Sequence, residues 1–267
     1  METPVIIAGA GPGGLTTALA LQMRGVPVLV FESVATLKPL GVGINLLPHA
    51  VRVLDGLGLR PALEQIAIQT GELCYFNKFG QLIWAEPRGR AAGYAFPQYS
   101  IHRGRLQWLL YEMVLTRLGA DAVQTGYTLT TWQEEADGIR VRFQTLEGTT
   151  EEVFGACLIA ADGIHSAARG QLYPQEGAPL FAGRILWRAV SVAEPFLTGR
   201  TMIMAGHQNQ KFVCYPIAPA ADQPGKALIN WVAELYDPAW APPKQDWNRQ
   251  VSKERFAEPF TPGALTG

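Results

Sequence analysis

The first thirty-two residues hold the pattern that most restricts the fold of this chain. An apolar segment at residues 5–8 is followed by the glycine-rich turn Gly9–Gly14, an uninterrupted run from residue 15 to residue 24, and a second apolar segment at residues 28–32. Short apolar runs bounded by glycines predict strands, and the longer run between them predicts a helix. The order strand, turn, helix, strand predicts a βαβ unit in a parallel sheet, and so an α/β fold.

The glycines of this turn have the spacing G-x-G-x-x-G, at Gly9, Gly11 and Gly14. In this motif the first glycine permits the tight turn, the second lets the backbone approach a pyrophosphate, and the third lets the helix pack against the sheet. The helix N-terminus adds free N–H groups and a positive dipole end. Because a strand and a helix flank the glycines, we interpret the turn as a pyrophosphate site. Its candidate contacts are Gly9, Gly11, Pro12, Gly13 and Gly14.

Glu32 ends the second predicted strand. A carboxylate at that place can accept hydrogen bonds from both hydroxyls of an adenosine ribose, and it would repel a 2′-phosphate. The motif therefore predicts FAD or NAD as the ligand and disfavours NADP at this site. It does not by itself distinguish FAD from NAD.

Composition and charge argue against several partners. Of the 267 residues, 48% are hydrophobic and 17% are charged, with a net charge of −1, so neither nucleic acid nor an anionic membrane is expected. No run of eighteen apolar residues predicts a membrane span, and residues 1–7 lack the basic start of a signal peptide. We therefore expect a cytoplasmic protein. Its three scattered cysteines, Cys74, Cys157 and Cys214, are expected to be buried free thiols.

No metal site or nucleophile is predicted. The four histidines are isolated, and no H-x-x-x-H or Cys/His pattern suggests zinc; they are His49, His102, His165 and His207. His102 stands beside Arg103 and could approach a cofactor, although a structural or solvated histidine is the commoner role. The absence of G-x-S-x-G argues against an α/β-hydrolase.

The middle of the chain contains further predicted elements. Residues 72–77 and 81–85 predict a β-hairpin, and residues 103–118 predict a helix with a buried apolar stripe. The continuous apolar run 156–161 predicts a parallel strand buried on both faces, followed by a helix from Ile164 to Leu172. Short strands are also predicted at 121–125, 127–133, 138–144 and 150–154.

From residue 173 the pattern changes to strands with glycine and proline turns. Four such segments predict a mostly antiparallel sheet, at 184–193, 200–205, 211–217 and 227–235. The tail from Asp237 is rich in proline and has no packing signal. Several aromatics could line an apolar pocket for a flat ligand or be ordinary core residues, namely Tyr94, Phe96, Tyr99, Trp187, Phe212 and Tyr215.

Two other segments are candidate ligand contacts. The loop 38–45 holds Gly41 and Gly43, a spacing that suggests close approach to something flat or to another segment. Asp162 and Gly163 follow the apolar run, at the place where open α/β sheets bind ligands. Asp is also a good helix N-cap, and the spacing does not separate these two roles.

These residues together resemble the single-component FAD-dependent aromatic hydroxylases, the p-hydroxybenzoate hydroxylase-like group. The resemblance rests on the glycine turn with Glu32, on Arg103 opening a helix as Arg-x-x-Leu, and on Ala161-Asp162-Gly163 followed by Ser166 and Arg169. Within the group, the stretches 39–45 and 99–104 and the pair Trp187-Arg188 most resemble bacterial phenazine hydroxylases that act on 5-methylphenazine-1-carboxylate. The resemblance covers residues 4–250.

The resemblance implies FAD as cofactor, NADH or NADPH as transient reductant, O₂ as co-substrate and a small planar aromatic substrate. The flavin C4a-hydroperoxide would carry the chemistry, so no catalytic side chain is expected. The glycine turn would hold the pyrophosphate, Glu32 the ribose and Arg103 the phosphate–ribitol region. Val42 and Gly43 would lie along the flavin ring. Asp162 and Gly163 would lie near the pyrophosphate and the path of the nicotinamide nucleotide.

The resemblance also implies two domains. A Rossmann-like FAD-binding domain is expected at residues 1–172, with a hairpin insertion near 72–99 that belongs to the substrate side. A mostly antiparallel substrate-binding domain is expected at 173–267. The family's third motif, a Gly-Asp-Ala-x-His stretch, is absent from this chain, which contains no Gly-Asp pair. The FAD-binding domain is therefore expected to be incomplete and the substrate domain truncated, so the activity of this exact chain is in question.

Two alternatives remain open at this stage. An NAD-dependent oxidoreductase would share the dinucleotide turn, although the Tyr-x-x-x-Lys tetrad of many dehydrogenases is absent. A non-catalytic nucleotide-binding remnant would agree with the missing third motif. The sequence does not indicate the oligomeric state.

Overall fold

The computed structural model describes residues 3–177, 180–239 and 260. The chain divides into two compact units. The first comprises Met1–Gly41, Val53–Gln65 and Arg103–Ala178, and the second comprises Val42–Arg52, Ile66–His102 and Pro179–Gly267. Each unit is therefore assembled from segments that are distant in the sequence.

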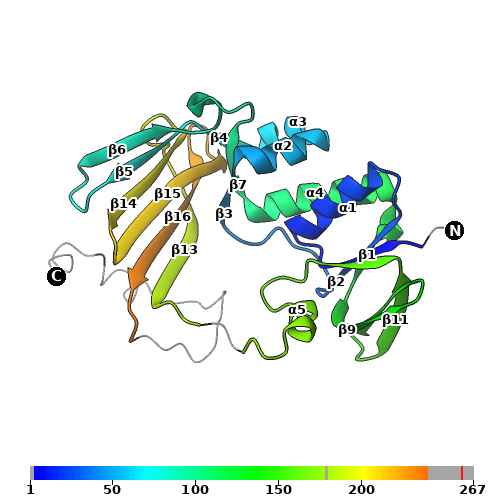
Figure 1. Ribbon diagram of the computed structural model, residues 1–267. Coiled ribbons are helices and arrows are strands. Elements are labelled where there is room, and N and C mark those ends of the chain that lie inside the picture. The colour runs from blue at the N-terminus through cyan, green and yellow to red at the C-terminus, as the bar shows by residue number, and fades with distance from the viewer. Residues whose placement is uncertain (1–2, 178–179, 240–259, 261–267) are drawn as a thin grey trace. The chain divides into compact units, whose positions relative to one another are not determined.

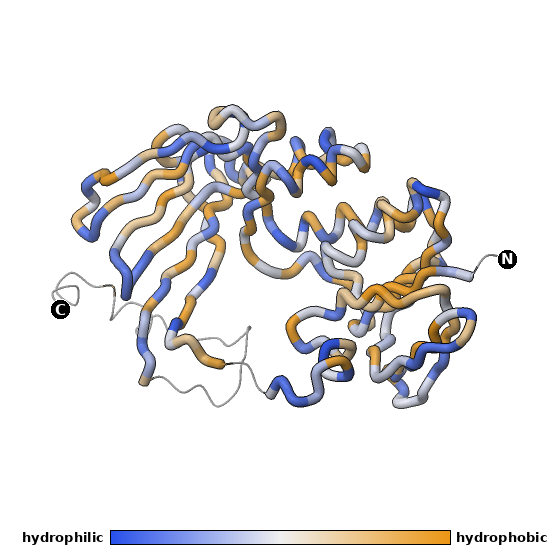
Figure 2. Tube along the Cα trace, in the orientation of Figure 1, coloured by the Kyte–Doolittle hydropathy of each residue, from blue (hydrophilic) through white to orange (hydrophobic). Residues whose placement is uncertain are grey.

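The first unit is built on a four-stranded parallel sheet with the strand order β12-β1-β2-β8. The strands are β1 (Val5–Ala8), β2 (Val28–Glu32), β8 (Val123–Thr125) and β12 (Cys157–Ala160). Helices α1 (Pro12–Gln22) and α4 (Arg103–Leu118) pack against each other. The predicted βαβ unit is confirmed, and all four residues of β1 are buried because strands flank it on both sides. Figure 2 shows this hydrophobic centre in orange.

A three-stranded antiparallel sheet covers part of this core, with the order β11-β10-β9. Its strands are β9 (Tyr127–Glu135), β10 (Gly138–Thr145) and β11 (Thr150–Gly155). The ring of Phe143 stacks on Phe31 of β2, with centroids 4.3 Å apart. Leu129 and Val141 complete the same buried cluster, so this small sheet is part of the core of the first unit.

The second unit contains a six-stranded sheet with the order β13-β16-β15-β14-β5-β6. All pairs are antiparallel except β14 with β5, which are parallel, so the predicted mostly antiparallel sheet is confirmed. The strands are β5 (Glu72–Phe76), β6 (Leu82–Pro87), β13 (Arg184–Ala193), β14 (Thr201–His207), β15 (Gln210–Pro219) and β16 (Ala227–Tyr236). The hairpin β5–β6 thus extends a sheet whose other strands follow residue 183 (Figure 1).

A second sheet of this unit has the order β3-β7-β4 and was not predicted. Its strands are β3 (Gly43–Leu46), β4 (Ala67–Thr70) and β7 (Gln98–His102), and the short 3₁₀ helix η1 (Gly89–Ala92) precedes β7. The predicted loop at 38–45 therefore ends in a strand. The hydroxyls of Thr70 and Ser100 lie 2.7 Å apart, and Ser100 donates to Asn45 at 2.7 Å. These buried polar pairs do not give the apolar alternation that marks a strand in sequence.

Three further helical elements lie in residues 48–122. They are α2 (Pro48–Gly56), α3 (Arg60–Ile66) and the 3₁₀ helix η2 (Ala120–Ala122). On α4, Leu106, Leu110 and Val114 are buried, which confirms the centre of the predicted apolar stripe. The predicted strand 121–125 is shorter than expected, because η2 takes its first residues and β8 begins only at Val123.

The prediction that residues 156–161 form a strand buried on both faces is wrong. β12 is parallel to β1 as expected, but it is the edge strand of the described sheet, and Cys157 and Ala160 are exposed. Cys157 is therefore an exposed thiol, contrary to the expectation for the three cysteines. Cys74 is buried, and burial raises the pKa of its thiol. Cys214 is half-buried, and burial raises its pKa to about 11.

The helix predicted from Ile164 is shorter than expected. α5 spans Ala167–Leu172, because Gly163 adopts a positive φ of 81° and the hydroxyl of Ser166 caps the first turn. Of the proline-rich tail predicted from Asp237, only residues 237–239 and 260 lie within the described residues. Among the described helices, none is long and apolar enough to cross a membrane.

Candidate functional site

The glycine turn after β1 is closely packed at its first and third glycines. Gly9 has a φ of +105°, and a Cβ atom there would lie 2.3 Å from the carbonyl oxygen of Ala161. A Cβ atom on Gly14 would lie 1.9 Å from the carbonyl oxygen of Gly9. The N–H of Gly9 also donates to the carbonyl of Phe31 at 2.7 Å. These two positions accept only glycine, because the turn, the helix and the neighbouring strand ends meet there.

The second glycine has a different environment. A Cβ atom on Gly11 or Gly13 would meet no atom of the described residues within 4 Å. Gly11 caps α1 without a side-chain hydrogen bond, Pro12 occupies the first turn, and that turn carries no acidic residue. The N-terminus of α1 therefore has no side-chain cap among the described residues, and the space beside Gly11 and Gly13 is open. Such an uncapped N-terminus behind a glycine fits a phosphate group.

Glu32 lies next to this turn. One carboxylate oxygen accepts a hydrogen bond from the N–H of Ala10 at 2.7 Å, and the other accepts from the Ser33 hydroxyl at 3.0 Å and the Val34 N–H at 3.1 Å. Glu32 ends β2 as predicted. The carboxylate is thus fixed beside the glycine turn, with capacity for further donors such as ribose hydroxyls.

Gln107 is a contact that the sequence reasoning did not identify. Its side-chain amide donates to the carbonyl of Ala10 at 2.8 Å, which connects α4 to the glycine turn. Gln107 follows Arg103 by four residues, so both side chains lie on one face of α4. The sequence could have indicated Gln107, because it lies four residues after the candidate site residue Arg103 in a predicted helix.

Arg103 is exposed at the first residue of α4. Its side chain runs beside Gly41, where a Cβ atom would lie 3.6 Å from Arg103 Cβ and 4.0 Å from its Nη1. Within the described residues, the guanidinium has no ion pair. An exposed, unpaired guanidinium at a helix start is available to an anionic group.

The Asp162 motif meets the glycine turn through its backbone. A Cβ atom on Gly9 would lie 3.2 Å from the Asp162 nitrogen. One oxygen of the Asp162 carboxylate accepts from the Ala168 N–H at 3.3 Å, and the Ser166 hydroxyl accepts from the Arg169 N–H at 2.9 Å. The carboxylate therefore assists in capping α5, which is the structural role considered for it. Gly163 leaves open space where a side chain would lie.

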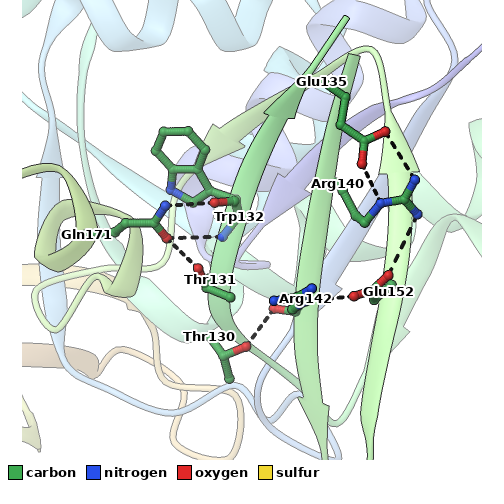
Figure 3. Close-up of polar contacts among 8 residues, drawn as sticks. All are labelled: Thr130, Thr131, Trp132, Glu135, Arg140, Arg142, Glu152 and Gln171. Carbon is green, nitrogen blue, oxygen red and sulfur yellow. Dashed lines mark hydrogen bonds and ion pairs between the residues drawn. The ribbon is translucent and has the colours of Figure 1, made fainter. Parts of the chain in front are cut away.

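Gln171 fixes α5 to the edge of β9 (Figure 3). Its side-chain oxygen accepts from the Thr131 hydroxyl at 2.8 Å and from the Trp132 N–H at 3.1 Å, and its side-chain nitrogen donates to the Trp132 carbonyl at 2.7 Å. The amide thus replaces the hydrogen bonds that another strand would make. Because Asp162 bonds to α5, this contact also positions the Asp162 motif.

Gly43 belongs to the second unit, and its close contact is with Asn230 of the same unit. Its N–H donates to the side-chain oxygen of Asn230 at 2.7 Å, and a Cβ atom on Gly43 would lie 2.6 Å from Asn230 Cβ. The close approach expected in this loop is therefore made, at Gly43, to a strand of the six-stranded sheet. Val42, the other candidate of this loop, is half-buried.

The predicted aromatic residues do not gather in one pocket. Tyr99 is buried in β7, and Tyr94 is exposed in the loop before it. Trp187 and Phe212 both pair with Ala233 and share one face of the six-stranded sheet, whereas Tyr215 pairs with Asn230 on the opposite face. Two faces of one sheet cannot line a single pocket. The described residues contain no cluster of three or more potential metal ligands.

The described site combines an uncapped helix N-terminus, a fixed carboxylate on the adjacent strand and an unpaired arginine. These groups suit a phosphate, a ribose diol and a second anionic group, in that order. No described side chain in the turn is a nucleophile. The arrangement can bind and orient a dinucleotide, and the chemistry would have to come from the ligand.

Comparison with known proteins gives consistent matches. The model of one family, described as an FAD binding domain, matches residues 2–259. The phenazine 1,6-dicarboxylic acid hydroxylase PhzS of Lysobacter antibioticus is 44% identical over 255 residues, covering 94% of this chain and 61% of that protein. The 3-amino-4-hydroxybenzoate 2-monooxygenase of Streptomyces cremeus is 34% identical over 221 residues, covering 80% of this chain and 53% of that protein.

The fold is also found among solved structures. HpxO of Klebsiella pneumoniae, solved with FAD and uric acid, aligns with a TM-score of 0.72 and 25% identity, covering 90% of this chain and 58% of that chain. The chain thus spans less than two thirds of the length of each of these proteins.

Proposed function

The chain belongs to the FAD-binding-domain family of flavoproteins, and from this premise we propose that it is an FAD-dependent monooxygenase that uses NADH or NADPH and O₂ to hydroxylate a planar, phenazine-like aromatic. The observation that carries the proposal is the uncapped N-terminus of α1 behind Gly11, with the Glu32 carboxylate fixed on the adjacent strand. Both features suit the adenosine diphosphate half of FAD.

We assign the following roles in cofactor binding. The turn Gly9–Gly14 holds the pyrophosphate, and the open space at Gly11 admits it. Glu32 accepts from the ribose hydroxyls, and Arg103 binds the phosphate–ribitol region. Asp162 and Gly163 lie beside the pyrophosphate, and Asp162 shares its carboxylate with the N-terminus of α5.

In this proposal the protein contributes binding and orientation. Bound FAD supplies hydride acceptance from the nicotinamide and activation of O₂, so no side chain has to act as a nucleophile. The first unit holds the dinucleotide. We also assign Val42 and Gly43 to the flavin ring, as the resemblance to the aromatic hydroxylases implies.

The second unit is assigned to the substrate. Its six-stranded sheet offers a broad surface for a flat molecule, and the hairpin β5–β6 enlarges it. The relatives from Lysobacter antibioticus and Streptomyces cremeus are named for aromatic carboxylic acids, which supports a substrate of that kind. We place the protein in the cytoplasm, where NADH and NADPH are supplied.

A titration of this chain with FAD, followed by flavin absorbance and fluorescence, tests the proposal. We expect saturable binding with a perturbed flavin spectrum. Gly11→Ala should weaken FAD binding by about tenfold or more, because the added methyl group fills the space for the pyrophosphate. Gly56→Ala is the matched control, since a Cβ atom there also meets nothing within 4 Å but lies in α2.

Other outcomes would separate the alternatives. Saturation by NAD with no binding of FAD would favour an NAD-dependent oxidoreductase. FAD binding without substrate-stimulated oxidation of NADH or NADPH would favour a nucleotide-binding remnant. Failure of a folded chain to bind either dinucleotide would contradict the proposed site.

A further inference from the structure

On one face of the six-stranded sheet, Arg188 stands at the end of a row of apolar side chains, next to a row that holds Glu234 and Lys211. Paired residues in adjacent strands lie on the same face of a sheet. The row that begins at Arg188 of β13 continues through Val232 of β16, Val213 of β15 and Met204 of β14. These three apolar side chains are half-buried. With strands ~4.8 Å apart, they form an apolar row about 10 Å long, the scale of a tricyclic aromatic.

Arg188 has no ion pair within the described part of the chain. It is exposed, and no acidic side chain among the described residues lies within 4.0 Å of its guanidinium. The acid nearest in register is Glu234, which pairs with Leu186, two residues from Arg188. Glu234 is already bound by Arg184 at 2.5 Å and by Lys211 at 3.3 Å. The positive charge of Arg188 is therefore not neutralised by its own sheet.

The neighbouring row adds neutral polar groups. Asn230 pairs with Val190 on one side and with Tyr215 on the other, so both polar residues share the face of Arg188. Burial raises the pKa of Tyr215, against smaller opposing effects from Arg188 and from the Asn230 amide. The phenol thus stays neutral at pH 7 and does not compete for Arg188. The Asn230 side-chain nitrogen is buried and has no acceptor with good hydrogen-bond geometry among the described residues.

We propose that Arg188 is an anion anchor on this face and binds a carboxylate of the planar aromatic substrate, while the row Val232–Val213–Met204 contacts its rings. The inference rests on the proposed function and names the residue that would recognise the carboxylate of its substrate. A guanidinium and a carboxylate form a bidentate, charge-assisted pair, which fixes the orientation of the acid as well as its affinity. Arg188 is thus a specificity-determining residue with no part in bond making.

The test compares two probes on the FAD-loaded chain. Phenazine-1-carboxylate and unsubstituted phenazine are titrated against wild type, Arg188→Gln and Arg188→Lys, with binding followed by calorimetry. We expect Arg188→Gln to weaken the carboxylate probe by about 10- to 100-fold, the range for hydrogen bonds to a charged group, and to change phenazine binding by less than about twofold. Arg188→Lys should recover part of the loss, because it keeps the charge without the planar fork.

Arg142→Gln is the matched control. It makes the same charge change on the three-stranded sheet of the first unit, where Arg142 pairs with Glu152 at 2.6 Å. It should leave both probes unaffected. If Arg188→Gln lost equal affinity for the two probes, or lost none for the carboxylate probe, Arg188 would not be the carboxylate-binding residue. The proposed function would be unaffected by either result. Absence of binding of both probes to wild type would instead remove the planar aromatic substrate, and the anchor with it.

Discussion

At the scale of single residues, the Glu32 carboxylate is held in place by hydrogen bonds and still has acceptor capacity for a ligand. Its carboxylate accepts from the Ala10 N–H, the Val34 N–H and the Ser33 hydroxyl. Two oxygens offer about four acceptor positions, so one remains, and the Ser33 hydroxyl can rotate away from another. A ribose diol needs two acceptor positions. Glu32 can therefore serve a bound nucleotide without releasing the backbone of the turn.

Glu32→Ala is predicted to weaken FAD binding by about 10- to 100-fold, since hydrogen bonds to a charged acceptor contribute about 1.5–3 kcal/mol. Isothermal titration with FAD measures the effect. Ser33→Ala is the matched control, because it removes only the hydroxyl that competes for the carboxylate, and it should keep or slightly raise the affinity. Unchanged affinity of Glu32→Ala would take Glu32 out of the site.

The site residues differ in how well a sequence can indicate them. Gly9, Gly14 and Glu32 were predictable, because a turn between a strand and a helix imposes their spacing. Asp162 was not, since capping and ligand binding favour the same residue at the same place. The pair Trp187-Arg188 was part of the family resemblance. The row that Arg188 forms with Val232 and Met204, however, depends on the register of three strand pairs. No local pattern encodes that register.

At the scale of elements, the strands with apolar patterns were predicted and those with polar interiors were not. β13 and β16 match their predicted ranges within one residue. β3 and β7 were missed, because Asn45 and Ser100 hydrogen-bond to each other where apolar side chains would usually pack. The burial of β12 was overestimated because an apolar run does not show whether a strand is central or at an edge.

The helix α5 depends on Gln171 for its position, and this dependence is testable. Gln171→Ala removes three hydrogen bonds to Thr131 and Trp132. At about 0.5–1.5 kcal/mol for each bond, discounted for their exposure, we expect a loss of about 1–3 kcal/mol in unfolding free energy, measured by urea denaturation. Amide exchange in α5 should also become faster.

Gln175→Ala provides the control for that variant. Gln175 is exposed, lies four residues after Gln171 and has no side-chain hydrogen bond to the described residues. Its removal should leave both stability and exchange unchanged. If Gln171→Ala were equally neutral, the contact between α5 and β9 would not be a stabilising one.

At the scale of the whole molecule, the family predicted from the motifs is confirmed by the match over residues 2–259. The predicted combination of a parallel sheet and a mostly antiparallel sheet is also confirmed. The described parallel sheet has β12 at its edge, with backbone groups on one side that pair with no described strand. Open strand edges of this kind favour association between chains.

We therefore predict that the chain associates as its concentration rises, and light scattering measures this. Cys157→Lys should reduce association, because a charge on an edge strand opposes strand pairing. Cys157→Ser removes the exposed thiol but keeps the edge, and it should associate like wild type. A wild type that stays monomeric at every concentration would show that the edge of β12 is protected. Reduced association in Cys157→Ser would point to a disulfide instead.

The glycine turn is held from three sides, by Phe31 at Gly9, by Glu32 at the Ala10 N–H and by Gln107 at the Ala10 carbonyl. A loop held in this way has lost its conformational freedom before any ligand arrives. The ordering entropy is then part of folding and is absent from the binding step. The hydrogen bonds that a cofactor makes at this end of the molecule are therefore not offset by ordering of the loop, and their loss in a variant should shorten the lifetime of the complex more than it slows encounter.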